Sequence, residues 1–236
     1  MSRVFLTGDV HGDFRRFGTE FFAEGKFLTK DDVVIILGDT AILWDPIDNI
    51  SDKEKHWTKW LANKPFTTLF LAGNHENHDR LDNLRTSFGY GSEIGVVTDS
   101  IYHLRNGNVY TINNKKFFVM GGAVSIDQAS RIEGLSWWRQ EVPSIGDWYD
   151  ANNNLLDNNN KVDYILTHTM PIRKLVEFNN MIGGYVGDPK LKDPTCDGLQ
   201  TIYETVEFKK WFCGHFHRSL KLDDIQVLYT DIIELD

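Results

Sequence analysis

The chain has 236 residues, of which 41% are hydrophobic and 25% charged, and a formal net charge of −9. This length and composition are typical of one globular domain, so we expect a single domain over residues 1–236. An acidic chain repels a phosphate backbone, which disfavours duplex nucleic acid as a partner.

Short runs rich in Val, Ile, Phe and Leu recur along the chain. Several are apolar almost throughout, as expected for strands that are covered on both faces. In chain order, the expected strands are Val4–Thr7, Val33–Leu37, Thr67–Leu71, Ile101–Leu104, Val109–Ile112, Lys116–Met120, Asp163–Thr167, Lys210–Cys213, Leu220–Leu222 and Gln226–Ile232.

Helical patterns fall between these strands. They consist of apolar residues at helical spacing and of capping residues at the expected helix starts. The patterns are the spacing of Phe14, Phe17 and Phe21, the capping box Ser51–Glu54, the expected helix start at Ser144–Asp147, and the N-caps Asp79 and Thr195. Strands that alternate with helices predict a layered α/β domain, and the hairpin-like later strands indicate mixed sheets.

The segment Asn180–Pro194 is rich in Gly and Pro and predicts a long, mobile loop. Loops of this length are either binding lids or plain surface excursions, and both interpretations stay open. The two cysteines, Cys196 and Cys213, are too few for a disulfide framework. The chain reaches Asp9 without a signal peptide and has no apolar run of about eighteen residues, so we expect a cytoplasmic protein with no membrane partner.

Polar side chains follow the strands at the points where the strands end. In α/β sheets the loops at these ends converge on one rim, where ligand sites collect. A lone His at such a position is usually structural, but five of the eight histidines lie in these segments. The residues concerned are Asp9, His11, Asp39, Asn74, His75, His168, His215 and His217. Imidazole and carboxylate donors together suit Mn, Fe, Zn or Ni better than Ca or Mg alone.

The same motifs resemble a known family. From about Val4 to Arg218 the chain carries, in order, Gly8-Asp9-Val10-His11-Gly12, Gly38-Asp39, Gly73-Asn74-His75-Glu76, His168 and Gly214-His215-Phe216-His217. This order is similar to that of the calcineurin-like metallophosphoesterase superfamily. The resemblance implies a four-layer α-β-β-α sandwich with two mixed β-sheets and a metal site at the strand-end loops.

The resemblance also implies roles for these residues. Two divalent or trivalent metal ions would be bound, with Mn or Fe favoured and Zn or Ni compatible, and a hydroxide bridging them would attack a phosphate mono- or diester. Asp9, His11 and His217 would hold one metal, Asn74, His168 and His215 the other, and Asp39 would bridge both. His75 would not be a ligand but would donate a proton to the leaving group.

The second motif departs from the pattern of many relatives, which continue it as Gly-Asp-x-x-Asp. Ile42 stands where the second Asp would orient His75, and no Arg follows nearby, which argues against a close relative of the eukaryotic-type protein phosphatases. Asp45 could replace that Asp if its loop folded back, although a helix cap or a surface position is the favoured interpretation.

Further cations could contact the substrate. Gly121-Gly122-Ala123 followed by Ser136-Trp137-Trp138 resembles a bacterial or phage branch of the superfamily, and Arg131 lies between these two elements. Arg131 is our candidate for substrate binding, with a solvated surface position equally favoured. For Arg173 the surface position is the favoured interpretation.

Three functions remain after this reasoning: a phosphoesterase, a non-catalytic metal-binding scaffold of the same fold, and a nuclease or nucleotide phosphodiesterase. The complete set of expected ligands favours an enzyme, and the net charge disfavours a long polynucleotide. The sequence does not indicate the substrate or the oligomeric state. Substrate selectivity is expected from the loops Ile42–Ile50, Ser125–Glu141 and Asn180–Pro194.

Overall fold

The computed structural model describes residues 2–184 and 192–235. The strands are β1 Val4–Thr7, β2 Val33–Ile36, β3 Thr67–Phe70, β4 Arg85–Gly89, β5 Ser92–Thr98, β6 Ile101–Leu104, β7 Val109–Ile112, β8 Lys115–Met120, β9 Tyr164–Thr167, β10 Lys210–Cys213, β11 Leu220–Lys221, β12 Ile225–Val227 and β13 Ile232–Leu235. The α-helices are α1 Asp52–Ala62, α2 His78–Asp82, α3 Ile145–Asp157, α4 Ile172–Ile182 and α5 Pro194–Thr205. Short 3₁₀ turns cover Phe14–Phe17, Ala23–Phe27, Gln128–Ser130 and Arg139–Glu141.

The strands form two mixed sheets, as expected. The seven-stranded sheet has the order β13-β1-β2-β3-β6-β5-β4, and the six-stranded sheet has the order β11-β12-β10-β9-β8-β7. In the first sheet β1, β2, β3 and β6 run parallel, and β13, β5 and β4 pair antiparallel at its two ends. In the second sheet β8, β9, β10 and β12 run parallel, and β7 and β11 pair antiparallel.

Alternation along the strands explains the layering. In β1, Val4 and Leu6 belong to a cluster that also contains Phe117 of β8, so this cluster lies between the sheets. Phe5, one residue along, joins the cluster formed with α1 and the first 3₁₀ turns on the outer face. Successive side chains of a strand point to opposite faces, so each apolar strand packs against the other sheet on one face and against the outer layer on the other.

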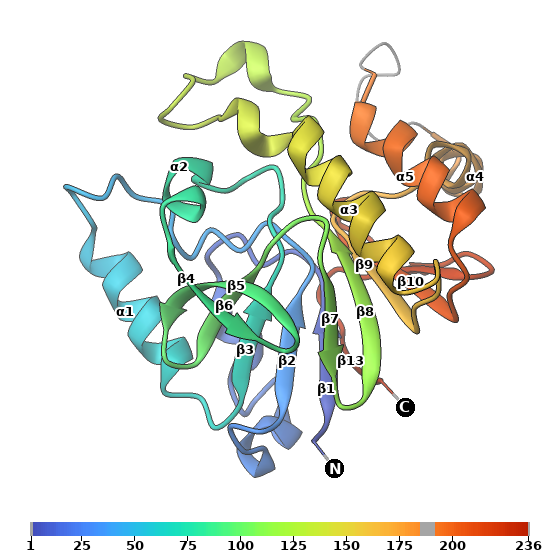
Figure 1. Cartoon of the computed structure of the whole chain (residues 1–236). Coiled ribbons are helices and arrows are strands. Elements are labelled where there is room, and N and C mark those ends of the chain that lie inside the picture. Colours follow the sequence, from blue (N-terminus) through green and yellow to red (C-terminus); the bar gives the residue numbers. More distant parts are fainter. Residues whose placement is uncertain (1, 185–191, 236) are drawn as a thin grey trace.

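Helices cover both outer faces and complete the four-layer α-β-β-α sandwich. Phe118 of β8 and Trp211 of β10 belong to a third cluster, which includes apolar residues of α3, α4 and α5. Figure 1 shows α3, α4 and α5 on one side of the two sheets and α1 on the opposite side. Within the described residues, we find no helix that is long and apolar enough to cross a membrane.

Two helix starts agree with the expected capping residues. Ser144 forms a complete capping box with Asp147 at the start of α3. At α1 only half of the capping box forms. The Ser51 side chain accepts from the backbone N–H of Glu54, but the Glu54 side chain does not accept from the backbone N–H of Ser51. The Glu54 carboxylate instead accepts from the backbone N–H of Asp45 at 2.8 Å and from Arg80 at 2.6 Å, so it holds the preceding loop.

Several local predictions were wrong. Phe21 is 68% exposed, and only Phe14–Phe17 of that pattern forms a 3₁₀ turn. Asn77, not Asp79, caps α2, and Asp193, not Thr195, caps α5 because its side chain accepts from the N–H of Thr195.

Two strand predictions also need correction. The hairpin of β4 and β5 has no counterpart among the expected strands, since β4 is almost wholly exposed and lacks the apolar pattern. The expected strand Gln226–Ile232 is split into β12 and β13, which lie in different sheets. Of the expected loop Asn180–Pro194, the start belongs to α4 and Pro194 begins α5, while 185–191 lie outside the described residues.

Candidate metal centre

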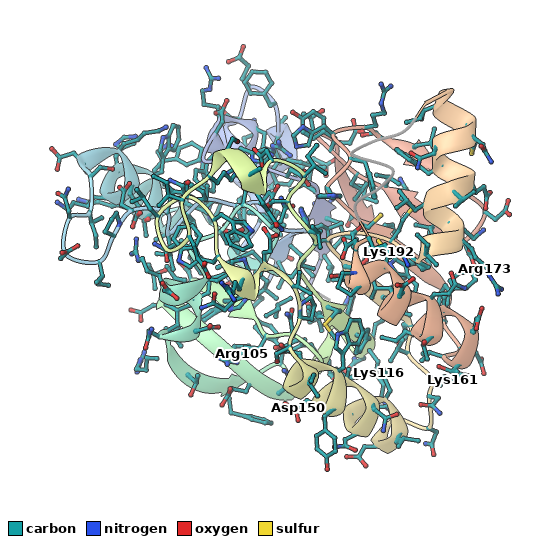
Figure 2. The ribbon with its side chains drawn as sticks, turned by 90° about the horizontal axis from the view of Figure 1, so that it is seen from above. Arg105, Lys116, Asp150, Lys161, Arg173 and Lys192 are labelled. Atoms are coloured by element: carbon teal, nitrogen blue, oxygen red, sulfur yellow. The ribbon has the colours of Figure 1, made fainter. Side chains whose placement is uncertain are left out.

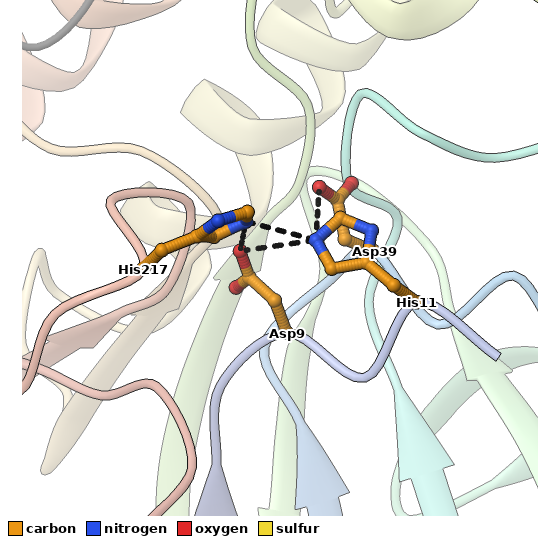
Figure 3. Close-up of side chains that lie close together, drawn as sticks. All are labelled: Asp9, His11, Asp39 and His217. Carbon is orange, nitrogen blue, oxygen red and sulfur yellow. Dashed lines mark hydrogen bonds and ion pairs between the residues drawn. The ribbon is translucent and has the colours of Figure 1, made fainter. Parts of the chain in front are cut away.

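Four side chains at the ends of β1, β2 and β10 form the first group of metal donors. Asp9, His11, Asp39 and His217 each offer one ligand atom, and these atoms all lie within 4.8 Å of one another. Nε2 of His11 lies 2.8 Å from Nε2 of His217 and 3.7 Å from Oδ2 of Asp39. Figure 3 shows these side chains converging from separate segments of the chain.

A second group lies on the other side of Asp39. Oδ1 of Asp39 is 3.3 Å from Nε2 of His168. Oδ1 of Asn74 lies 3.0 Å from both Nε2 of His168 and Nδ1 of His215. The two carboxylate oxygens of Asp39 therefore face different groups, which is the arrangement that a bridging ligand requires.

The backbone around these donors is strained. His11, Asp39, His215 and His217 have φ between 49° and 70°, in the left-handed region that non-glycine residues seldom adopt. Such strain collects at functional sites, where the surrounding structure imposes it. Gly73 shows how close the approach is, since a Cβ there would overlap Oδ1 of Asp39.

Hydrogen bonds fix the orientation of the second group. Nδ1 of His168 lies 2.8 Å from the carbonyl oxygen of Leu37, which can only accept, so the neutral ring keeps its proton on Nδ1 and turns the electron pair of Nε2 toward the site. Nδ2 of Asn74 donates to Oγ of Ser125 at 2.9 Å, and that hydroxyl donates to the buried carboxylate of Glu141 at 2.6 Å. Asn74 therefore presents its carbonyl oxygen to the donors.

Two further residues hold the loops that carry the donors. Arg16 donates to the carbonyl oxygens of Asp9, Gly8 and Tyr229, which ties the loop after β1 to the segment before β13. The buried carboxylate of Glu76 accepts from the backbone N–H of Thr40 at 2.6 Å, directly after Asp39. Glu76 belongs to the Gly73–Glu76 motif, whereas Arg16, Ser125 and Glu141 lie outside the motifs and sequence reasoning missed them as supporting residues.

The donors fit a bound cation. Asp9 is fully buried, and its Oδ2 accepts no hydrogen bond from the described residues, although Nε2 of His217 lies 3.1 Å away at ion-pair distance. Buried carboxylate oxygens are normally paired, so an unpaired one among imidazole nitrogens indicates a place for a positive charge. Nitrogen, carboxylate and amide donors together are typical of a transition-metal site.

The pKa values of His168 and Asp39 are shifted by the charges that these two side chains place beside each other. Burial lowers the pKa of His168, but the nearby carboxylate of Asp39 outweighs it and the net effect raises this pKa to about 9. Burial likewise opposes ionisation of Asp39, whose pKa the surrounding imidazoles nevertheless hold well below its usual range. The ionised form of Asp39 is thus the stable one in the folded chain.

A cleft of about 370 Å³ opens beside the first group. His11, His75 and Arg131 line it together with Trp44 and Trp57. This places the predicted substrate-binding Arg131 and the predicted acid His75 at the same opening. The guanidinium is held by Asp127, whose Oδ1 accepts from Nε at 2.7 Å, and by the carbonyl oxygen of Ser136 at 2.9 Å.

The two uncertain residues have other partners. Oδ2 of Asp45 accepts from the backbone N–H of Ser51 at 2.9 Å, so Asp45 braces the start of α1, although it also lines the cleft. Arg173 is exposed on α4 and pairs with Glu204 of α5 at 2.9 Å. Figure 2 shows Arg173 at the periphery of the molecule.

Comparison with known proteins identifies a family. A family model described as calcineurin-like phosphoesterase matches residues 2–219. No curated protein matches the chain. The matched range includes every residue of both donor groups.

Proposed function

The chain belongs to the calcineurin-like phosphoesterase family, and from that premise we propose that it is a single-domain hydrolase of phosphate mono- or diesters that uses two metal ions. The observation that carries the proposal is the position of Asp39. Its Oδ2 faces His11, and its Oδ1 faces His168 at 3.3 Å. One carboxylate between two groups of donors is suited to bridging a metal pair, which in phosphatases lies about 3.5–4 Å apart.

In this proposal each group holds one ion. Asp9, His11 and His217 bind the first, Asn74, His168 and His215 bind the second, and Asp39 bridges both. The mixture of imidazole, carboxylate and amide donors favours Mn or Fe, with Zn or Ni compatible. Bound ions would lower the pKa of a coordinated water toward about 7 and offset the negative charge of the phosphate ester.

His75 is the proposed proton donor to the leaving oxygen. Its backbone N–H donates to Oδ1 of Asp39 at 2.8 Å, which places the imidazole at the mouth of the cleft beside His11. Burial lowers the pKa of His75, the Asp39 carboxylate opposes this, and Arg131 lowers the pKa further. The free protein therefore holds His75 neutral near pH 7, and the negative charge of a bound ester would favour its protonation.

Arg131 is the proposed phosphate-binding cation. Its Nη2 donates to no residue within 2–184 and 192–235, while Nε and Nη1 are held by Asp127 and Ser136. A guanidinium held in this way offers a fixed N–H donor, and Arg pairs well with phosphate oxygens.

A metal-loaded screen of monoesters and diesters tests the proposal. We expect metal-dependent turnover by the full chain and a loss of about 10²–10³-fold in kcat for Asp39→Asn, since the negative charge between the two groups of donors disappears. Metal content by elemental analysis accompanies each assay. Glu204→Gln, on the distant surface of α5, serves as the control and should retain wild-type activity.

Two outcomes would contradict the proposal. Stoichiometric metal without turnover of any phosphate ester would support the binding scaffold instead. Full activity of Asp39→Asn would remove Asp39 from the bridging position.

A further inference from the structure

The cleft beside the metal centre has an aromatic wall. Phe14, Ile42, Trp44 and Trp57 line it, and His11 and His75 form its boundary with the proposed catalytic groups. Its volume of about 370 Å³ falls within the roughly 300–1,000 Å³ of small-ligand sites. A group esterified to a phosphate on the metals would extend directly into this space.

Both indole rings that line the cleft pack against further aromatic side chains. Trp44 meets Trp138 with ring centroids 5.7 Å apart at 82°, and Trp138 is itself buried and donates to Asp79 at 2.9 Å. Trp57 meets Trp60 at 5.2 Å and 86° and Phe14 at 5.9 Å. Each indole is only half-buried, so it retains a free surface toward the cleft.

The loop that carries Trp44 is fixed by hydrogen bonds. Asn77 donates to the carbonyl oxygen of Trp44 at 3.1 Å, and Arg80 donates to that of Asp45 at 2.8 Å. Arg80 also pairs with the buried carboxylate of Glu54 on α1 at 2.6 Å. A wall that is ordered before binding loses little entropy when a ligand docks, so its rings are suited to stacking.

Charge and shape narrow the class of ligand. The cleft carries two cations, Lys53 and Arg131, and two carboxylates, Asp45 and Glu54. This balance gives no cationic track for a polynucleotide. A flat ring with polar edges could stack on an indole while it hydrogen-bonds to Asp45, Ser51 or Lys53 at the rim.

We propose that the aromatic cleft binds the base of a nucleoside phosphate ester, so that the substrate is a small nucleotide. This inference rests on the proposed function, because the metal centre must hold the phosphate while the base occupies the cleft. Arg131, at the same opening, would contact the phosphate and so fix the distance between phosphate and base.

Ribose 5-phosphate and adenosine 5′-monophosphate provide the test, since in both compounds the leaving oxygen is the 5-hydroxyl of a ribose and only the second carries a base. If the screen shows diesterase activity instead, the methyl esters of the same two compounds replace them. We expect the base to raise kcat/KM of the metal-loaded full chain at least about fivefold, the lower end of what one base–aromatic stack contributes. Trp57→Leu should reduce this ratio toward one and leave kcat/KM for the ribose compound within about twofold.

Trp148→Leu is the matched control, because Trp148 packs against the cluster of α3, α4 and α5 and does not line the cleft. It should retain the preference for the base. Trp44→Leu, at the other indole, tests the same wall if Trp57→Leu fails to fold. A base-to-ribose ratio near one in the wild type, or a ratio that survives both cleft substitutions, would overturn the inference.

Binding separates this inference from the proposed function. Calorimetric titration of metal-loaded protein with both compounds measures the preference for the base even without turnover. A Trp57-dependent preference for the base in an inactive protein would support the base-binding cleft and contradict the proposed hydrolase. Metal-dependent turnover without any preference for the base would support the hydrolase and contradict the base-binding cleft.

Discussion

Arg131 is oriented before any substrate is present. Asp127 accepts from Nε at 2.7 Å, Ser136 accepts from Nη1 at 2.9 Å, and the side chain, which is 21% exposed, lines the cleft together with His75. A guanidinium held on two sides spends little side-chain entropy on a third contact. In the proposed function, phosphate recognition would therefore depend on this one residue more than on the net charge of the chain.

We expect Arg131→Ala to raise KM and to lower kcat/KM about tenfold or more, since a hydrogen bond to a charged group is worth roughly 1.5–3 kcal/mol. Arg131→Lys should recover only part of the loss, because an ammonium lacks the planar fork. Steady-state kinetics on the substrate found in the screen measures both. Arg139→Ala, which breaks an exposed pair with Glu133, is the control; unchanged constants in Arg131→Ala would remove Arg131 from the site.

The sequence singled out the strand-end side chains that the structure brings together, but not the residues that orient them. Asp9, His11 and the other donors stand directly behind apolar strands, so the local pattern reveals them. Ser125 and Glu141 act through a contact to Asn74 that spans 51 residues of sequence. No local pattern encodes such a distance, and the sequence indicated only that the loop Ser125–Glu141 could face the substrate.

At the scale of elements, the 3₁₀ turn Phe14–Phe17 positions the loop after β1, which carries Asp9 and His11. Phe14 and Phe17 are buried beneath the first sheet, and this anchors Arg16 between them. Arg16 then reaches the carbonyl oxygens of Asp9, Gly8 and Tyr229. The turn thus connects the outer apolar layer with the backbone of two strand ends.

Arg16→Met should lower metal affinity about 10- to 100-fold, the typical effect of losing a group that supports metal ligands. It should also lower Tm, because three carbonyl oxygens lose a charged donor. Metal titration and thermal unfolding with chelator measure the two effects separately. Arg15→Met is matched in size and charge, but Arg15 is exposed and pairs with Asp13, so it should change neither. A Tm change with unaltered metal affinity would mean that Arg16 only stabilises the fold.

Element prediction depended on burial. Strands such as Val33–Ile36 are covered on both faces, and their continuous apolar sequence identifies them. β4 is exposed and owes its place to pairing with β5, a tertiary cause that composition does not record. The caps of α2 and α5 were missed by two residues each because several Asx and Thr residues near each start could serve.

At the scale of the whole molecule, the core and the candidate site occupy different parts of the two sheets. The inner cluster between the sheets is apolar, and the donor residues occupy the rim where β1, β2, β3, β9 and β10 end. The ligands of each proposed metal come from more than one strand end, and Asp39 joins the two sets. The site therefore exists only when both sheets are stacked, which couples metal binding to the global fold.

Acid stability should depend on one buried histidine that lies outside the metal centre. His103 of β6 is 8% exposed, stacks on Phe70, and neither ring nitrogen has a hydrogen-bond partner among the described residues. Burial, with Arg105 and His78, lowers its pKa to about 3. The folded pKa lies below the unfolded value of about 6.5, so its stabilising contribution is complete above pH 6.5 and is lost as the pH falls toward 3.

We expect His103→Phe, which preserves a ring on Phe70, to weaken this pH dependence. Between pH 7 and pH 5 the free energy of unfolding of the wild type should fall by about 2 kcal/mol more than that of the variant, from about 1.4 kcal/mol per pH unit below 6.5. Urea unfolding of metal-free protein at both pH values measures the difference, and titration of the other histidines cancels between the two chains. His56→Asn, at an exposed position of α1, should keep the wild-type dependence. Parallel pH dependences for wild type and His103→Phe would show that His103 is not held neutral by the fold.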